Sequence, residues 1–332
     1  MKIAYFGSGT WGFSLASLLA SKGNEVTLWG RDPALIKTLQ KTREHPKLPG
    51  FPAAPTLQFT TDFSEAISHA DIFVESVTTQ GIRPICEKLV SLNTPPTPFI
   101  LTSKGIEQNT CLLLPEVVLH VMGLESKPFI GALSGPSHAE EVVQKLPTSI
   151  VATAYDPHLI SKIHGWFSAP FFRIYPNADI NGVTLGGAMK NIIAIACGIS
   201  DGLGFGDNTK AALMTRGLHE IKKLSVVKNA KPETLNGLSG LGDLCVTCLS
   251  NHSRNSRFGR LIGQGLSFKE AEKKTGMVVE GAYTCAAAMQ LAEETHIEVP
   301  ITKAVYDILY NNVNPSDAVK QLLQRAIKEE HL

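Results

Sequence analysis

The sequence has almost no excess charge of either sign. Its 332 residues include 31 Lys and Arg against 30 Asp and Glu, a formal net charge of +1. This balance produces no long-range field that would attract nucleic acid or an anionic membrane. We therefore expect neither partner, and any anionic ligand must be held by local charges.

Cysteine is also scarce and scattered, unlike the dense pattern of a small secreted disulfide framework. We expect reduced thiols at all six positions, which are Cys86, Cys111, Cys197, Cys245, Cys248 and Cys285. The pair Cys245 and Cys248, followed by His252, has metal-like spacing. No second Cys or His pair nearby completes four ligands, so the sequence predicts no metal site.

A third feature that the sequence lacks is an apolar run approaching the roughly 20 residues of a membrane-spanning helix. The first predicted strand begins at residue 2, which leaves no room for a signal peptide. We expect a cytoplasmic protein without membrane insertion. Hydrophobic residues make up 43% of the chain, enough for one large or two ordinary cores, and we expect two domains.

A glycine triplet, Gly7, Gly9 and Gly12, lies between a short apolar strand at 2–6 and an apolar helix pattern from Phe13 onward. Gly7 permits the turn, Gly9 lets a pyrophosphate approach the backbone N–H groups, and Gly12 permits close helix packing. Because the triplet follows a strand and precedes a helix, it predicts a dinucleotide-binding loop.

The second predicted strand, Glu25–Trp29, ends where such a fold contacts the adenosine ribose. Asp32 could bind the ribose hydroxyls, but with Pro33 it also forms a good N-cap and first turn, which we favour. Arg31 would then be available for a 2′-phosphate, so NADPH is the favoured cofactor and NAD the other candidate. The alternative is that Arg31 is a solvated surface side chain.

Strands and helices alternate to about residue 175, as in a largely parallel sheet, and the pattern is helical from Ile180 to the end. We expect an α/β Rossmann-type domain over 1–178 and an all-α substrate-binding and catalytic domain over 179–332. Beyond the first two strands and a loop at 47–55, the expected elements are strands at 71–77, 99–103, 129–133, 149–154 and 171–175 and a helix at 157–167.

Two lysines stand in surroundings unusual for surface charges. Lys104 directly follows the strand at 99–103, where a nicotinamide would lie, although an exposed loop lysine is the alternative. Lys190 lies in a helix that is apolar on almost every side, so it must be paired or face a cavity, unless it reaches the surface from a helix start. Such a lysine is suited to proton transfer, because burial lowers the pKa of its amine.

Two further segments carry polar groups among glycines. Asp243 is either a site acid or a helix N-cap. The trio Ser253, Arg254 and Asn255 suits the acceptor oxygens of a phosphate, with Arg257 and Arg260 as alternatives. The turn Gly135 to Glu140 places Ser137 and Glu140 in capping-box spacing, and its amides could also face the cofactor. A catalytic role for its His138 is the weaker interpretation.

Taken together, these residues closely resemble the bacterial NAD(P)-dependent glycerol-3-phosphate dehydrogenase family. The resemblance covers nearly the whole chain through ordered motifs: Gly7-Ser8-Gly9-Thr10-Trp11-Gly12, Trp29-Gly30-Arg31-Asp32, Ser103-Lys104-Gly105, Ser134-Gly135-Pro136-Ser137, Gly186-Gly187-Ala188-Met189-Lys190-Asn191, Ser200-Asp201-Gly202-Leu203-Gly204-Phe205-Gly206, Gly240-Leu241-Gly242-Asp243-Leu244 and Ser253-Arg254-Asn255. Position 31 varies between Arg and His in such enzymes, which leaves the cofactor preference open, and Cys245 replaces an aliphatic residue.

The resemblance implies a helical C-terminal domain of the 6-phosphogluconate dehydrogenase-like kind, a homodimer, and interconversion of dihydroxyacetone phosphate and sn-glycerol 3-phosphate for phospholipid synthesis. It makes Lys190 the proton-transfer residue. It also implies substrate binding by Lys104, Gly135, Ser137, Lys190, Asp243, Ser253, Arg254 and Asn255. The implied cofactor-binding residues, together with the glycine triplet, are Thr10, Trp11, Arg31, Lys104, Ala139, Arg254, Val278 and Glu280.

Two other functions fit the same two-domain plan. A hydroxy-acid or ketopantoate dehydrogenase would bind a carboxylate in place of the phosphate. Both remain as alternatives because fold alone does not fix chemistry. A noncatalytic NAD(P)H sensor would need only the glycine loop, so the coexistence of Lys104, Lys190 and Asp243 argues against it.

Overall fold

The computed structural model describes residues 1–326 and 329, which divide into two compact units. The first unit comprises 1–103 and 114–180, and the second comprises 104–113 and the chain from Asn181 onward. The sequence analysis divides the chain once, after residue 178. The contacts additionally place the ten residues 104–113, which include Lys104, with the helical unit.

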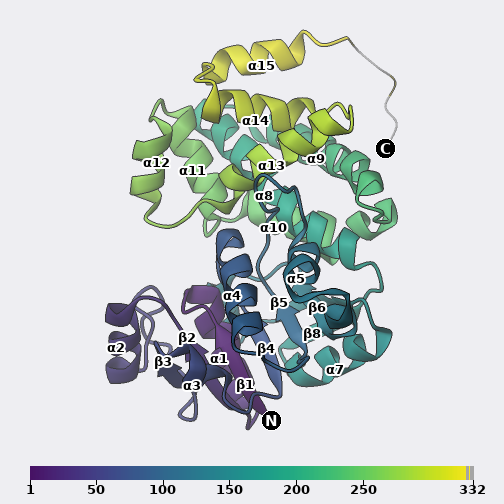
Figure 1. Cartoon of the computed structure of the whole chain (residues 1–332). Coiled ribbons are helices and arrows are strands. Elements are labelled where there is room, and N and C mark those ends of the chain that lie inside the picture. The colour runs from purple at the N-terminus through teal and green to yellow at the C-terminus, as the bar shows by residue number, and fades with distance from the viewer. Residues whose placement is uncertain (327–328, 330–332) are drawn as a thin grey trace. The chain divides into compact units, whose positions relative to one another are not determined.

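The first unit is built on one sheet of eight strands in the order β3-β2-β1-β4-β5-β6-β7-β8 (Figure 1). All neighbouring strands are parallel except β6 and β7, which are antiparallel. The bounds are β1 Lys2–Phe6, β2 Glu25–Trp29, β3 Gln58–Thr60, β4 Ile72–Glu75, β5 Phe99–Leu101, β6 Ile130–Ser134, β7 Thr148–Ala154 and β8 Phe172–Pro176.

The strands expected from the sequence are confirmed within two residues at each end, and the sheet is largely parallel as expected. The short strand β3 is absent from the sequence-based interpretation because three residues, only two of them buried, give no readable alternation. Chain order reverses between β1 and β4, which creates the crevice at the carboxyl ends of the strands that ligands of such sheets occupy.

Both faces of the sheet are covered, as its apolar strands require. On one face Tyr5 packs in a cluster with Phe13 of α1, and on the other Phe6 stacks on Phe63 of α3 at 5.1 Å between ring centroids. The helices of this unit are α1 Thr10–Ser21, α2 Pro33–Thr42, α3 Phe63–Ile67, α4 Thr79–Ser91, α5 Leu114–Met122, α6 Ala139–Val142 and α7 Pro157–Phe167, with a 3₁₀ turn at Leu124–Phe129.

The second unit is helical, as expected, and its core surrounds α8, Ile180–Gly202. The other helices are α9 Asp207–Val227, α10 Asp243–Leu249, α11 Arg254–Gly263, α12 Phe268–Thr275, α13 Glu280–Glu294, α14 Pro300–Tyr310 and α15 Pro315–Leu323. A 3₁₀ turn at Pro232–Asn236 and one turn of π-helix at Leu238–Gly242 precede α10.

Helix α8 corrects one expectation, that no apolar run approaches the length of a membrane span. Among the described residues α8 alone is long and apolar enough by length and composition, but 94% of its most apolar stretch is buried inside the protein. An all-round apolar helix of this kind is typical of a protein core.

Candidate functional site

The glycine loop between β1 and α1 has the geometry that close approach of a phosphate requires. Gly7 has φ +111, and a Cβ there would lie 2.5 Å from the carbonyl oxygen of Ser76. A Cβ on Gly12 would lie 2.0 Å from the carbonyl oxygen of Gly7, whereas one on Gly9 would meet nothing within 4 Å. Gly7 and Gly12 are therefore required by packing, and the space beside Gly9 is open.

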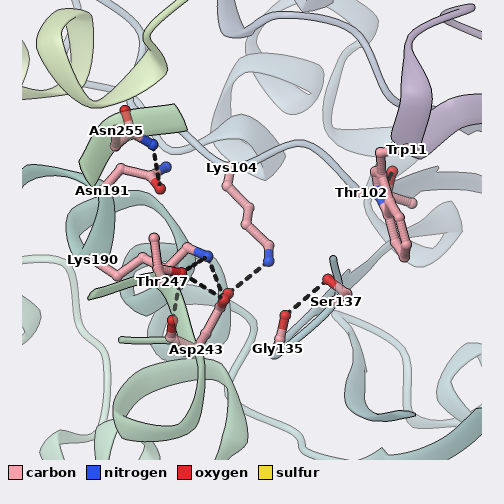
Figure 2. A network of polar contacts seen from close by, with 10 residues as sticks. All are labelled: Trp11, Thr102, Lys104, Gly135, Ser137, Lys190, Asn191, Asp243, Thr247 and Asn255. Carbon is pink, nitrogen blue, oxygen red and sulfur yellow. Dashed lines mark hydrogen bonds and ion pairs between the residues drawn. The ribbon is translucent and has the colours of Figure 1, made fainter. Parts of the chain in front are cut away.

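The first turn of α1 opens onto that space. Gly9 is the N-cap residue and no side chain caps the helix. The backbone N–H groups and the positive end of the helix dipole suit an anion. Trp11, in this first turn, donates its indole N–H to Thr102 Oγ1 at 3.1 Å (Figure 2). These residues fit the pyrophosphate of a dinucleotide.

The end of β2 settles one alternative left open by the sequence. The Asp32 carboxylate accepts hydrogen bonds from Ala34 N at 2.9 Å and Leu35 N at 3.3 Å, so Asp32 is the N-cap of α2, as favoured. Arg31 is exposed beside it, two residues after the end of the strand. An exposed guanidinium at this position can pair with a phosphate on the adenosine ribose.

The turn after β6 also lies in the first unit. Gly135 has φ +133, and Ser137 Oγ donates to the Gly135 carbonyl oxygen at 2.9 Å. Helix α6 begins at Ala139 with His138 as N-cap and no side-chain capping bond. The capping box expected from Ser137 and Glu140 is therefore wrong, because the Ser137 hydroxyl turns back to the preceding loop.

A buried cluster of two lysines and one aspartate occupies the second unit (Figure 2). Asp243 bonds through one carboxylate oxygen to Lys190 Nζ and through the other to Lys104 Nζ at 2.6 Å. Lys190 also donates to Thr247 Oγ1 at 2.7 Å. The Asp243 side chain is 1% exposed and the Lys190 side chain 9%. Asp243 is therefore the shared counterion of both lysines rather than a helix N-cap.

The backbone around this cluster explains the close approach. A Cβ on Gly186 of α8 would lie 2.6 Å from the carbonyl oxygen of Ser239, in the π-helical turn. A Cβ on Gly240 would lie 2.1 Å from the carbonyl oxygen of Leu235. Because neither residue has a side chain, the π-helical turn packs closely against α8. Asp243, which directly follows this turn, therefore reaches Lys190.

Burial and charge set the protonation of the cluster. Burial, with Lys104 nearby, lowers the pKa of Lys190 to about 7 despite the opposing charge of Asp243. Burial alone would raise the pKa of Asp243, but the two ammonium groups outweigh it and hold that pKa below its usual value. Lys190 can therefore gain or lose a proton near neutral pH while Asp243 stays ionised.

Ser253, Arg254 and Asn255, at the start of α11, make different contacts. Ser253 is the N-cap and accepts from Ser256 N at 3.2 Å. Asn255 donates to Asn191 Oδ1 at 2.9 Å and accepts from Gly281 N at 3.0 Å, which joins the starts of α11 and α13 to α8. Arg254, the first residue of α11, is exposed.

The hydrogen bond from Gly281 N to Asn255 also brings Arg254 into one region with Val278 and Glu280. Arg254 directly precedes Asn255, and Val278 and Glu280 lie within three residues before Gly281. The alternative arginines are engaged elsewhere. Arg257 donates to the carbonyl oxygens of Lys274 and Thr275, and Arg260 pairs with Asp201 at 3.5 Å.

The predicted site residues thus form two groups, one in each unit. The glycine loop, Trp11, Arg31 and the turn at 135–139 belong to the first, whereas Lys104, Lys190, Asp243 and 253–255 belong to the second. Sequence reasoning missed Thr247, one turn after Asp243 and between Cys245 and Cys248, and Asn191, beside Lys190 at the end of the motif 186–191. It also missed Thr102, which precedes Lys104 by two residues.

The cysteines are all unpaired by disulfides, and only Cys245 is more than slightly exposed. Within 1–326 and residue 329, no group of three or more His, Cys, Asp or Glu side chains could hold a metal ion. The sequence motif of Cys245, Cys248 and His252 therefore does not form a metal site in this part of the chain.

Comparison with known proteins gives consistent matches over both units. The family model described as NAD-dependent glycerol-3-phosphate dehydrogenase N-terminus matches residues 2–160, and the corresponding C-terminus model matches 179–320. A protein named glycerol-3-phosphate dehydrogenase [NAD(P)+] from Chlamydia pneumoniae is 56% identical over 330 residues, which cover 99% of each chain.

Two further relatives agree. The protein of the same name from Protochlamydia amoebophila is 56% identical over 331 residues, 100% of this chain and 99% of its own. The crystal structure of glycerol-3-phosphate dehydrogenase from Coxiella burnetii superposes with a TM-score of 0.93 at 37% identity, covering 98% of this chain and 99% of that one.

Proposed function

Because the chain belongs to the NAD-dependent glycerol-3-phosphate dehydrogenase family, we propose that Lys190 is its proton donor and that Asp243 and Thr247 hold it in place. The enzyme is an NAD(P)-dependent oxidoreductase that interconverts dihydroxyacetone phosphate and sn-glycerol 3-phosphate. The observation that carries the assignment of Lys190 is the buried cluster in which two ammonium groups share one carboxylate.

When bound, the nicotinamide cofactor would supply a hydride to the carbonyl carbon of the ketone, or accept one from the same carbon of the alcohol. As this carbon is reduced, its oxygen gains negative charge and needs a proton and nearby positive charge. Two of the three Lys190 protons are directed to Asp243 and Thr247, which leaves one for that oxygen. In the oxidation direction, a neutral Lys190 accepts the proton of the hydroxyl group.

Charge favours the same assignment. While Lys190 is protonated, the cluster holds two positive charges against one negative charge, so it attracts an oxygen that becomes anionic. Lys104 adds positive charge beside the reacting oxygen. Thr247, which donates to the Asp243 carbonyl oxygen at 2.6 Å, orients its oxygen toward Lys190 as an acceptor.

Arg254 is the residue we assign to the substrate phosphate. Its guanidinium is exposed at the first turn of α11, where the helix N-terminus adds backbone donors and a favourable dipole. Lys104, Gly135, Ser137, Ser253 and Asn255 complete the substrate site. Asn255 acts through the fold of this region, since both ends of its amide bond to Asn191 and Gly281.

The pyrophosphate of the cofactor is bound by the first unit, at Gly9 and the first turn of α1, Thr10 and Trp11. Arg31 favours NADPH over NADH by pairing with the 2′-phosphate. Lys104, Ala139, Arg254, Val278 and Glu280 are the further cofactor-binding residues. Residues 1–178 serve as the cofactor-binding domain and 179–332 as the substrate-binding and catalytic domain.

The cellular assignment follows from the activity. We place the enzyme in the cytoplasm as a homodimer that supplies sn-glycerol 3-phosphate for glycerophospholipids, without nucleic-acid partners or membrane insertion. The oligomeric state can be measured by light scattering, where a mass near that of one chain would contradict the dimer.

The substrate assignment is tested by following NAD(P)H oxidation with dihydroxyacetone phosphate and with unphosphorylated dihydroxyacetone, using each cofactor in turn. Rapid turnover only with the phosphorylated ketone supports the Arg254 and Lys190 assignments together. Cofactor binding without turnover on either ketone, combined with turnover on a 2-keto acid, would contradict them.

A further inference from the structure

Glu75 ends strand β4 with a carboxyl group that is completely buried. The three residues before it in the strand are apolar, and no Lys, Arg or His of the described chain forms an ion pair with it. Burial raises the pKa of Glu75, although hydrogen bonds oppose this. An apolar residue would complete the strand without this penalty, so the carboxyl group requires an explanation beyond packing.

The Glu75 carboxyl group joins the ends of two neighbouring strands. One oxygen accepts from Thr102 N at 2.9 Å and Ser103 N at 3.1 Å, just past the end of β5. The other accepts from Ser103 Oγ at 2.7 Å and Val77 N at 3.0 Å, in the loop after β4. Four donors from two loops therefore converge on one side chain.

A chain of hydrogen-bonded hydroxyl groups ends at the Glu75 carbonyl oxygen, and the donor and acceptor of each of its hydrogen bonds can be assigned. Thr102 Oγ1 donates to the Glu75 carbonyl oxygen at 2.6 Å, so its single proton is used. Ser76 Oγ, 2.6 Å from Thr102 Oγ1, must then be the donor to it, and Tyr5 the donor to Ser76. Thr102 Oγ1 thus offers only acceptor capacity to its remaining neighbour.

That neighbour is Trp11, whose indole N–H lies 3.1 Å from Thr102 Oγ1 (Figure 2). Trp11 belongs to the first turn of α1, directly after the open space at Gly9. Since Thr102 can only accept, the hydrogen-bond order fixes the indole with its N–H toward β5. Glu75 holds Thr102 through both its side chain and its main chain.

These contacts lie where the second half of a dinucleotide must pass. The pyrophosphate site is at the start of α1, and the adenosine site is at the end of β2, on the β3 side of β1. The nicotinamide half therefore extends over the ends of β4 and β5. We propose that Glu75 is a positioning residue for the nicotinamide half of the cofactor, fixing the two strand ends and, through Thr102, the Trp11 indole.

The proposal rests on the cofactor placement proposed above, and binding measurements separate the two. The change is Glu75→Gln, which keeps size but presents an amide N–H₂ where an acceptor is needed. NADPH and NADH report the whole cofactor. Adenosine 2′,5′-bisphosphate and ADP report the half without nicotinamide. Dissociation constants come from nucleotide fluorescence or calorimetry, so no turnover is required.

The matched control is Glu220→Gln, which alters another buried carboxyl group, one that accepts backbone N–H bonds in the second unit. We expect Glu75→Gln to weaken binding of the intact cofactor roughly tenfold, as loss of one well-placed hydrogen bond would, with adenosine fragments bound as by wild type. Ser103→Ala removes one donor and should act in the same direction more weakly. Glu220→Gln should change neither affinity.

Equal weakening of intact cofactors and fragments, or no weakening of either, overturns the role of Glu75. Failure of the wild-type protein to bind the fragments contradicts the cofactor placement itself. If Glu75→Gln does not fold, Ser103→Ala and Thr102→Val decide by the same criterion. Thr102→Val should reduce intact-cofactor affinity and alter the Trp11 emission, and unchanged affinity would overturn the link from Thr102 to the indole.

Discussion

Lys190 is hydrogen-bonded to Asp243 across 53 residues of sequence, and both side chains are almost completely buried. A buried ammonium that has only one carboxylate, shared with a second lysine, keeps a proton that is easily lost near neutral pH. The chemistry assigned to the enzyme follows from this pair.

Replacing Lys190 by Ala should lower kcat for dihydroxyacetone phosphate reduction by roughly 10²–10⁴, the usual contribution of a positioned general acid. NADPH affinity should stay near that of wild type. Steady-state kinetics and a fluorescence titration measure the two quantities. Lys303→Ala, at a lysine side chain that is 62% exposed, is the control and should keep full activity. Wild-type turnover by Lys190→Ala would refute the assignment.

The pH dependence should follow the pKa of about 7 of Lys190. Reduction requires the protonated amine, so its kcat/KM should fall as the pH rises through about 7. Oxidation of glycerol 3-phosphate requires the neutral amine and should rise over the same range. In Asp243→Asn the anion that raises the pKa of Lys190 is gone, so both transitions should move to lower pH. Profiles that do not move would exclude Lys190 as the titrating group.

Arg254→Ala should raise KM for dihydroxyacetone phosphate by about 10- to 100-fold, since a charge-assisted bond contributes about 1.5–3 kcal/mol. The slow reaction with unphosphorylated dihydroxyacetone should be unaffected. Arg216→Ala, at an exposed arginine of α9, serves as the control. An equal loss with both ketones would show that Arg254 does not bind the phosphate.

Arg31→Ala should raise KM for NADPH by about tenfold and leave KM for NADH nearly unchanged, because only NADPH carries the 2′-phosphate. The measurement is the ratio of kcat/KM for the two cofactors. A ratio equal to that of wild type would mean that Arg31 is a solvated surface side chain.

Glu220→Gln should change the pH dependence of stability. The Glu220 carboxyl group accepts from Ile301 N and Thr302 N at the start of α14, and burial raises its pKa to about 6. With a folded-state pKa above the usual 4.5, its contribution is fully present below pH about 4.5 and falls as the pH rises through about 6. Relative to Glu220→Gln, wild type should therefore lose about 2 kcal/mol of unfolding free energy over this range. Parallel urea-unfolding curves at all pH values would contradict this.

Local patterns predicted most of the fold. The glycine triplet, the Asp32 cap and the buried strands are written in neighbouring residues, so sequence spacing suffices to find them. The antiparallel pairing of β6 and β7 was not predicted, because strand direction depends on how the connection crosses the sheet rather than on the strand's own residues.

Long-range contacts limited what could be predicted of the site. The apolar surroundings of Lys190 showed that it needed a partner, but not that Asp243 was that partner or that Lys104 shared it. Asp243 equally suited a helix N-cap, and only the packing of the π-helical turn on Gly186 decides between the two roles. Glu75 gave no signal, because its donors come from a loop 27 and 28 residues away in sequence or from its own turn.

The shared carboxylate also links folding to ligand binding. Below pH about 7 the cluster contains one more positive charge than negative charge in surroundings poor in water. The repulsion between the two ammonium groups makes the ligand-free protein less stable than its packing alone would allow. A substrate that binds only the folded state, with its reacting oxygen accepting from Lys190, raises the melting temperature with its concentration. Glycerol 3-phosphate would thus be a thermal stabiliser of the enzyme that makes it, and the stabilisation would diminish as Lys190 loses its proton.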